Sequence, residues 1–452
     1  MAHSHRKNSD RRTFLKLSAK LAALGAASVG LGSRGVFAAE AATTTGLTDY
    51  KALVCVYLFG GNDANNMIVP IDLYSTYQSL RGGIALSPNQ LLTITQGAKS
   101  YGLHYGMPEM KDLYNTGQLA FVLNMGQLEQ PITRTQYQAG LNTPTNLFSH
   151  SDQTVQAQTG TSKPNGFGWG GRLLDGCGIT DTLAAISMSS PALFLQGMNI
   201  GGNVIPPGTG LNLSGMSFWP SNEAQSRRGA LDEILKLDGG NTIRKAANRQ
   251  MADGLQLAAS LQNAAGGGDG LNFPGTALGN QLKEVARLIK LRAPQGPGRQ
   301  VFFCSMDGFD LHSGQDWNHW YLLSSLSQAV NAFHQAIGNL PDNVGNQVTL
   351  FTQSEFGRTL QPSGTGSDHA WGSHQMVLGG AVKGGIYGSF PEFALGGPDD
   401  ANNRGVWIPK ISTSQFGATL GKWFGADETA LGLAFDNLDK FVGNTDLGFM
   451  KP

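Results

Sequence analysis

Short apolar runs that end abruptly in polar residues recur along this chain and predict the strands of a buried sheet. Residues 53–59, 301–306 and 348–352 are apolar on both alternating faces, which is typical of strands covered on both sides of a parallel sheet. Residues 119–123 form a fourth run, and they follow a short helix predicted over residues 108–117. Strands and helices that alternate in this way predict an α/β fold with a mostly parallel central sheet.

Apolar residues at helical spacing predict the longer helices. Residues 223–264 contain two amphipathic segments, and residues 315–340 form one long helix. The triple glycine at residues 266–268 is the clearest flexible joint in the chain. We therefore expect residues 39–452 to form a single domain with a helical insertion around residues 220–295.

Composition narrows the classes of partner. The chain has 452 residues, and its 32 basic and 32 acidic residues cancel to a formal net charge of +0. This balance favours neither nucleic acid nor an anionic membrane surface as a partner. Three cysteines are too few for a disulfide framework. Cys55 and Cys304 lie inside apolar runs, so we expect buried free thiols.

The first residues resemble a twin-arginine export signal. Arg11 and Arg12 precede Phe14, and a modestly apolar run rich in alanine and glycine follows over residues 17–31. Cleavage is expected after residue 38. This resemblance implies that the Tat translocase exports the folded chain to the bacterial periplasm or beyond. The alternative, an uncleaved membrane helix, fits less well because the run is short and interrupted; no later run is long enough for stable membrane insertion.

Carboxylate and imidazole groups follow the strand predicted at residues 348–352. They stand on a loop rich in glycine and serine, a combination that suits a metal ion better than it suits packing. The carboxylates and imidazoles are those of Glu355, Asp368, His369 and His374, and Arg358 lies among them. The alternative is a polar surface loop whose histidines face solvent.

Two other predicted strands also end in candidate ligands. Asp63 follows the first strand, and Asp310 and His312 follow the strand at residues 301–306. Residues two apart in an extended segment lie on the same side, so Asp310 and His312 can reach one ion together. If the strands are parallel neighbours, these groups meet Glu355 at one edge of the sheet, where one or two ions would sit.

Ser149, His150 and Ser151 stand side by side before Asp152. Members of a catalytic triad come together from distant positions, whereas adjacent residues point in different directions, so we discount a triad. A serine here can cap the start of a helix. It remains open whether one of these residues is instead a nucleophile or a ligand.

Four long motifs resemble a known family. They are LFGGNDANN at residues 58–66, GFDLHS at 308–313, QSEFGRT at 353–359 and SDHAWGSHQMVLGGAVKGG at 367–385. In this order, behind a twin-arginine leader, they resemble the bacterial family called domain of unknown function 1501. That family is grouped by fold with alkaline phosphatases, sulfatases and cofactor-independent phosphoglycerate mutases. The resemblance implies an alkaline phosphatase-like three-layer sandwich, with helices on both faces of the sheet.

The resemblance also implies roles for the candidate ligands. Asp63 is similar to the first-strand metal aspartate of the superfamily. Asp310 and His312 resemble the aspartate–histidine pair of one metal, with His369 or His374 as its later histidine. Glu355 stands where the superfamily shows Asp-His, and this departure removes a ligand of the second metal.

The resemblance leaves the nucleophile less well defined. The helix opening at Ser149, His150 and Ser151 is similar in place to the sulfatase nucleophile helix, but the sulfatase sequence pattern is missing. Arg358 could bind an anionic substrate through its planar guanidinium, or pair with a structural carboxylate. We take Ser149, His150 and Arg358 as the catalytic candidates.

Two functions follow from these expectations. The first is an exported hydrolase of phosphate or sulfate esters that acts on a small anionic substrate and uses zinc, manganese or calcium. Its metal candidates are Asp63, Asp310, His312, Glu355, Asp368, His369 and His374. The alternative is a catalytically degenerate protein of the same fold that serves as a binding or assembly component of the periplasm or cell surface.

Overall fold

The computed structural model describes residues 47, 49–181, 183–208, 221–237, 239–263, 272–291 and 298–451. The leader predicted at residues 1–38 and the glycine joint at residues 266–268 lie outside this part of the chain. No helix in the described part is long and apolar enough to cross a membrane.

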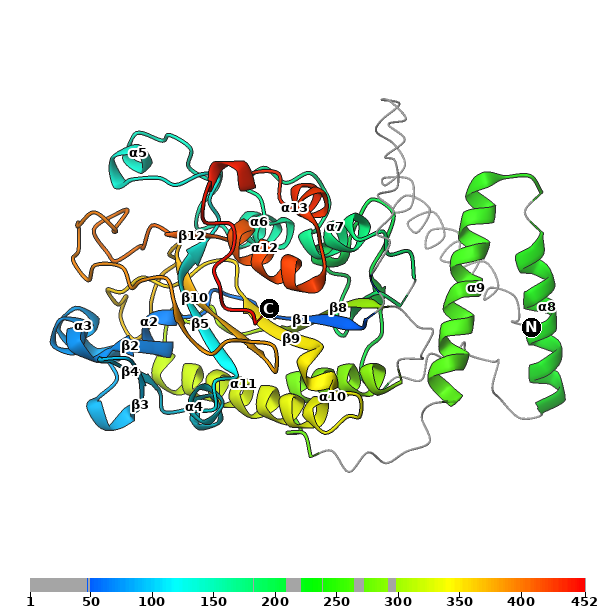
Figure 1. The fold of residues 1–452 in the computed structure, drawn as a ribbon, viewed down its shortest axis with the longest axis horizontal. Coiled ribbons are helices and arrows are strands. Elements are labelled where there is room, and N and C mark those ends of the chain that lie inside the picture. The colour runs from blue at the N-terminus through cyan, green and yellow to red at the C-terminus, as the bar shows by residue number, and fades with distance from the viewer. Residues whose placement is uncertain are drawn as a thin grey trace, which may run out of the picture. The chain divides into compact units, whose positions relative to one another are not determined.

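A mostly parallel sheet forms the centre of the fold (Figure 1). In spatial order its described strands are β11 (Gly385–Tyr387), β5 (Leu119–Gly126), β10 (Ser373–Gly379), β9 (Val348–Gln353), β1 (Lys51–Leu58), β8 (Arg299–Met306), β6 (Ala185–Ser187) and β7 (Asn203–Val204), while β12 (Ile411–Ser412) pairs with β5. Strand β10 runs antiparallel to both of its neighbours, and the other pairs are parallel.

Strand β1 lies between β8 and β9 and is parallel to both, as predicted from its apolar pattern. Its alternate residues enter two separate cores. Val54 and Val56 face one core, whereas Leu53 and Cys55 face the other, and all four are 0% exposed. The sheet is therefore covered on both sides, which explains the uninterrupted apolar run in this strand.

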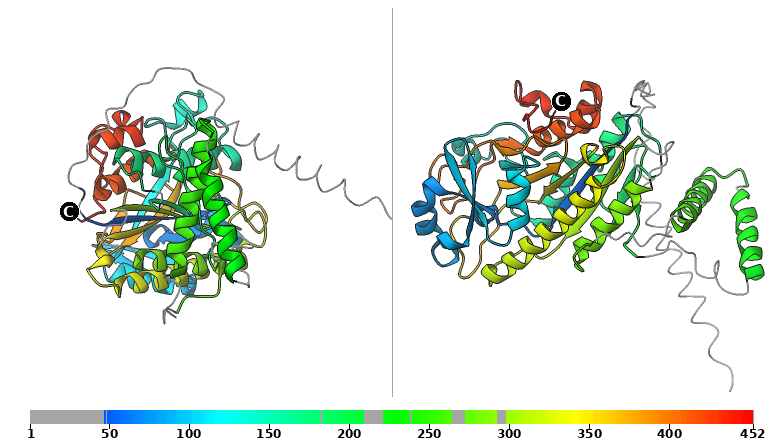
Figure 2. Two further views of the ribbon diagram at one scale, coloured as in Figure 1. Left: turned by 90° about the vertical axis from the view of Figure 1, so that its right-hand side faces the viewer. Right: turned by 60° about the horizontal axis from the view of Figure 1, so that its bottom comes forward.

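Helices form a layer on each face of the sheet, so the predicted α/β fold with a mostly parallel sheet is confirmed (Figures 1 and 2). On one face lie α4 (Pro108–Asn115), α10 (Ala277–Lys290) and α11 (Gln315–Gly338). On the other face lie α6 (His150–Thr159), α7 (Trp169–Gly176), α12 (Thr413–Phe424) and α13 (Glu428–Ala434).

Two further helices, α8 (Ser221–Lys236) and α9 (Thr242–Asn263), pack against each other. Gly239 and Gly240 lie between them with φ angles of 58° and 75°. Glycine adopts this left-handed conformation without steric penalty, which explains the break in the helical pattern at these two residues.

A three-stranded antiparallel sheet was not predicted from the sequence. It has the order β2 (Ile68–Pro70), β4 (Lys99–His104) and β3 (Leu91–Gln96). Short helices accompany it or lie in neighbouring loops: α2 (Ala64–Met67), α3 (Tyr74–Arg81) and α5 (Arg134–Gln138). Single 3₁₀ turns occur at Ile71–Leu73, Gly82–Ile84, Pro88–Gln90, Leu193–Leu195, Val344–Asn346 and Leu438–Lys440.

The three cysteines, Cys55, Cys177 and Cys304, are buried free thiols. This confirms the expectation for the two that lie in apolar runs. None of them is available as a metal ligand at the surface.

Candidate metal centre

The carboxyl ends of β1, β8 and β9 lie side by side and bring their exit loops together. Gly60, after β1, donates its backbone N–H to Glu355 Oε1, after β9, at 2.8 Å. Gly60 has a φ of 114°, and a Cβ at this position would collide with the backbone of Phe309 and Asp310 in the loop after β8. Glycine is therefore required for the close approach of the three loops.

Helix α6 delivers His150 to this edge of the sheet. Ser149 is the N-cap of α6, and its hydroxyl oxygen accepts a hydrogen bond from the backbone N–H of Asp152. The predicted capping role of Ser149 is thus confirmed, and His150 becomes the first residue of the helix. His150 Nδ1 lies 2.8 Å from Glu355 Oε1.

His150, Asp310 and His369 form a compact group, whose ligand atoms all lie within 4.8 Å of one another. The Nε2 atoms of His150 and His369 are 3.1 Å apart. Asp310 Oδ1 lies 3.4 Å from His150 Nε2 and 3.2 Å from His369 Nε2. The three side chains come from α6, the loop after β8 and the loop after β9.

His312 extends this group on one side. Its Nε2 lies 3.0 Å from Asp310 Oδ1 and 3.1 Å from His369 Nε2. Asp310 and His312 thus contact the same partner, as their alternate positions in the sequence predicted. We call His150, Asp310, His312 and His369 the histidine cluster.

The hydrogen bonds of the other ring nitrogens assign the tautomers of the three histidines. His369 Nδ1 lies 2.7 Å from the carbonyl oxygen of Phe148, which can only accept, so this nitrogen carries the proton. Nδ1 of His150 faces Glu355, and Nδ1 of His312 lies 3.2 Å from Asp368 Oδ1. In the neutral form of each ring, with the proton on Nδ1, the three Nε2 lone pairs point toward one another and toward the Asp310 carboxylate.

This arrangement fits a cation. Lone pairs 3.1 Å apart repel unless a proton or a metal ion lies between them, and a carboxylate beside them adds negative charge. A histidine ligand whose second nitrogen donates to a carboxylate or carbonyl is the usual arrangement at protein metal sites. The cluster therefore has the donors and the surrounding hydrogen bonds of a metal site.

The surroundings of the cluster shift the pKa values of three of its ligand groups. Burial alone would raise the pKa of Asp310, but the hydrogen bond and charge of Arg358 lower it to about 2. Burial lowers the pKa of His369 below its ordinary value. The hydrogen bond to Glu355 raises the pKa of His150. Asp310 and His369 are thus ready to bind an ion at neutral pH, whereas the raised pKa of His150 makes its proton harder to remove than that of a free histidine.

Arg358 is buried, and its guanidinium is hydrogen-bonded to groups of the protein itself. Its Nε donates to the carbonyl of Gly61 at 3.0 Å and its Nη1 to the carbonyl of Ser367 at 2.9 Å, and Nη2 bonds both Gly60 and Asp310. Of the two roles considered for this residue, the structure shows the pairing with a carboxylate.

Asp368 contacts the cluster through His312 and not through the other ligand atoms. Its second oxygen accepts a hydrogen bond from Arg404 at 2.6 Å. Burial alone would raise the pKa of Asp368, but the hydrogen bond and charge of Arg404 lower it. Asp368 and Glu355 therefore orient histidines, although the sequence suggested them as ligands.

The structure does not bring Asp63 or His374 to the histidine cluster. The Asp63 carboxylate, 2% exposed, is bound by Arg81 and by the side-chain amide of Gln315. His374 is buried on β10, where its Nδ1 accepts a hydrogen bond from the backbone N–H of Asn124 at 2.9 Å. Nothing in the sequence pattern indicated that Asp63 would form an ion pair with Arg81.

A pocket of about 400 Å³ opens beside the cluster. It is lined by His150, Ser151 and Thr154 of α6, by Asp307 and Asp310 after β8, and by Glu355. Ser151 therefore faces the pocket, while Ser149 is occupied as the helix cap through its bonds to Asp152. The pocket can hold a small substrate between the start of α6 and the cluster.

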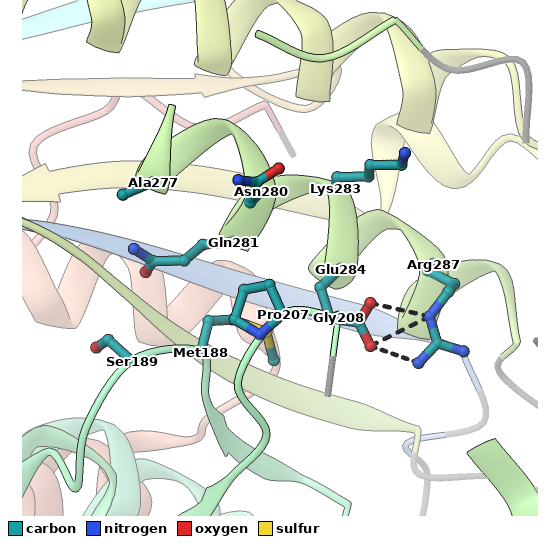
Figure 3. A pocket seen from close by; sticks show the side chains of 10 residues that line it. All are labelled: Met188, Ser189, Pro207, Gly208, Ala277, Asn280, Gln281, Lys283, Glu284 and Arg287. Atoms are coloured by element: carbon teal, nitrogen blue, oxygen red, sulfur yellow. Dashed lines mark hydrogen bonds and ion pairs between the residues drawn. The ribbon is translucent and has the colours of Figure 1, made fainter. Parts of the chain in front are cut away.

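A second cavity of about 590 Å³ lies between α10 and the segments that follow β6 and β7 (Figure 3). Met188 and Pro207 line one side, and α10 lines the other. The acid in this cavity, Glu284, is bound to Arg287 one turn along the same helix. None of the candidate ligands reaches this cavity, so we place the chemistry at the histidine cluster.

The fold and the cluster define an α/β protein with a candidate metal centre at the carboxyl edge of its sheet. The chain belongs to the family described as "Protein of unknown function (DUF1501)", whose sequence model matches residues 50–405. No curated protein matches the sequence.

Solved structures show a distant likeness. One is the protein Ps i-CgsB in complex with k-i-k-neocarrahexaose, with 10% identity and a TM-score of 0.36. The match covers 88% of this chain and 77% of that protein's chain. A putative sulfatase from Bacteroides thetaiotaomicron has 9% identity and a TM-score of 0.34, with 84% and 72% covered. A 2-O GAG sulfatase has 7% identity and a TM-score of 0.33, with 75% and 66% covered.

Proposed function

We propose that this protein is a metal-dependent hydrolase of phosphate or sulfate esters. The observation that carries the proposal is the convergence of three histidine Nε2 atoms and the Asp310 carboxylate beside an open pocket.

The residues of the cluster have separate tasks in this proposal. Asp310, His150 and His369 hold one ion, and His312 approaches the same group from the exposed side. A divalent ion bound here would polarise the ester oxygen and stabilise charge on the leaving group. Ser151 and Thr154 both line the pocket, and we take the exposed Ser151 hydroxyl as the group that attacks or orients water. Backbone N–H groups at the start of α6 favour an anionic substrate.

The donor set bears on the number and kind of ions. A site rich in imidazole favours zinc over calcium and manganese, which are better suited to oxygen ligands. Asp63, the candidate for a second ion, is bound by Arg81. The proposal therefore requires one ion.

We place the reaction outside the cytoplasm. The twin-arginine pattern at Arg11 and Arg12 supports export by the Tat translocase, and the periplasm or the cell exterior is then the site of action.

One observation favours the alternative, a non-catalytic binding or assembly component. Arg358 is buried, and its bonds to Gly60, Gly61, Ser367 and Asp310 leave little capacity to bind an anion. A protein of this fold that has lost its anion-binding arginine could retain an ion for structural reasons alone.

The test is the turnover of p-nitrophenyl phosphate and p-nitrophenyl sulfate by the purified full chain. We expect turnover that EDTA abolishes and that zinc restores more fully than manganese. Asp310→Ala should abolish it, while the control Asp72→Ala, at an exposed acid remote in sequence from the ligands, should not. Turnover that survives Asp310→Ala would eliminate the metal mechanism, and a metal-loaded chain without turnover of either ester would favour the binding component.

A further inference from the structure

Two aromatic side chains are exposed on one face of α11. Trp317 is 67% exposed and Tyr321 is 54% exposed. Among the residues that the structure describes, no other Trp, Tyr or Phe is exposed to this degree. Positions four apart on a helix lie on the same face, so the two side chains are neighbours. Large exposed aromatic groups of this kind mark binding surfaces.

Two partly buried rings extend this surface. Trp320 lies 4.7 Å from Trp317 between ring centroids, and Tyr105 lies 6.4 Å from Trp320 with its ring tilted by only 18°. We call Tyr105, Trp317, Trp320 and Tyr321 the aromatic ledge. The opposite face of α11 is buried against the sheet, so the ledge stands on a rigid support.

The ledge follows the candidate metal centre closely along the chain. The loop that carries Asp310 and His312 runs directly into α11, with Gly314 as its N-cap. Gly314 and Gln315 both donate backbone hydrogen bonds to Thr365, at 3.0 Å each. His312 and Trp317 are five residues apart, so their Cα atoms are separated by at most about 19 Å.

The lack of basic residues along α11 argues against an anionic ligand at the ledge. Residues 307–347, which include the whole of α11, contain no lysine or arginine, and Asp316 adds a negative charge next to Trp317. A phosphate-bearing polymer or an anionic membrane needs cations at its binding surface. A sugar ring needs none: its C–H face stacks on an aromatic ring, and its hydroxyls bond to groups such as the side chains of Asp316 and Asn318.

We propose that the aromatic ledge is a saccharide subsite, which binds an uncharged sugar unit next to the ester that lies at the histidine cluster. This inference rests on the proposed function and deepens it, because it makes the substrate a phosphate or sulfate ester of an oligosaccharide. Binding energy from the sugar unit would position the ester without any help from Arg358.

The test is binding of the labelled full chain to a printed array of plant, algal, bacterial and animal oligosaccharides. The wild-type chain should bind a subset of them. The double variant Trp317→Ala/Tyr321→Ala should bind the same glycans about tenfold more weakly, the loss expected for removing stacking contacts. Trp317→Phe, which keeps a ring, should restore part of the binding. Val442→Ala, at an 89% exposed side chain on another surface, should bind like the wild type.

Two results would overturn the subsite: a wild-type chain that binds no glycan, or a double variant that binds as well as the wild type. Both substituted side chains are exposed, so thermal unfolding of the double variant should match the wild type and exclude misfolding. A chain that binds glycans but releases neither phosphate nor sulfate keeps the subsite and loses the hydrolase. A chain that hydrolyses aryl esters but binds no glycan keeps the hydrolase and loses the saccharide subsite.

Discussion

At the scale of single residues, the candidate ligands depend on the groups bonded to their other ring nitrogens. Glu355 contacts His150, Asp368 contacts His312, and the Phe148 carbonyl contacts His369. Each partner fixes a ring so that Nε2 faces Asp310. The sequence identified His150, Asp310, His312 and His369 as candidates, but it could not pair the three histidines with the groups that orient them. His150 and Glu355 are 205 positions apart, and the carbonyl of Phe148 leaves no signal in a sequence.

Glu355→Gln tests the orienting role of this carboxylate. The amide cannot accept the His150 Nδ1 proton as strongly, and we expect zinc affinity to fall about 10- to 100-fold, the usual effect of losing such a partner. Competition titration with a zinc chelator measures it. Glu392→Gln, at an exposed acid, is the control and should leave the affinity unchanged. Equal affinities for Glu355→Gln and the wild type would show that Glu355 does not orient His150.

Asp63→Asn separates a structural acid from a ligand. It removes the charge that neutralises the buried Arg81 guanidinium, and we expect a loss of about 3–5 kcal/mol in the free energy of unfolding. Urea denaturation measures the loss. Zinc content of the folded variant should equal that of the wild type. A variant of unchanged stability that binds no zinc would show that Asp63 is a metal ligand and not a structural acid.

At the scale of elements, two short features place the site. Gly60 allows the exit loops of β1 and β8 to touch, and Ser149 fixes the first turn of α6, where His150 stands. Both features are readable in the sequence as a turn glycine and a capping serine. Their convergence is not, because it depends on the order of β8, β1 and β9 in the sheet.

Ser149→Ala removes the N-cap of α6. We expect a loss of about 1 kcal/mol in the free energy of unfolding, because the backbone N–H of Asp152 loses its acceptor. Urea denaturation gives the value. Ser149→Asp, which keeps a capping oxygen, should recover most of it. If alanine and aspartate at this position were equally stable, capping would not explain the role of Ser149.

At the scale of the whole molecule, the large sheet was predictable and the small one was not. Residues 53–59, 301–306 and 348–352 are apolar on both faces, which marks strands buried within a parallel sheet. Strand β3 has only one buried residue, Ile94, and β2 spans three residues ending in proline. Neither a mostly exposed strand nor a strand of only three residues carries a clear period, so this antiparallel sheet was missed.

Buried histidines make the stability of the whole molecule depend on pH. Burial lowers the pKa of His374 to about 4, because protonation would desolvate a charge and break its bond from Asn124. The unfolded chain binds this proton near pH 6.5, so the contribution is fully present above that pH and is lost as pH falls toward 4. It amounts to about 3 kcal/mol. Burial also lowers the pKa of His319, to about 3, which acts in the same direction.

We therefore expect the free energy of unfolding to fall between pH 6.5 and 4. Urea denaturation across this range measures it, and His374→Gln should make the dependence less steep, because His319 still contributes. A stability that stays constant or rises as the pH is lowered would contradict the neutral, buried state of His374.

The most direct measurement is the metal content of the full chain, purified in the presence of zinc and then dialysed against metal-free buffer. Inductively coupled plasma mass spectrometry should find about one ion per wild-type chain and almost none in the double variant Asp310→Ala/His369→Ala, with the fold checked by circular dichroism. A wild-type chain that keeps no ion, or a double variant that keeps as much as the wild type, would show that the histidine cluster is not a metal site.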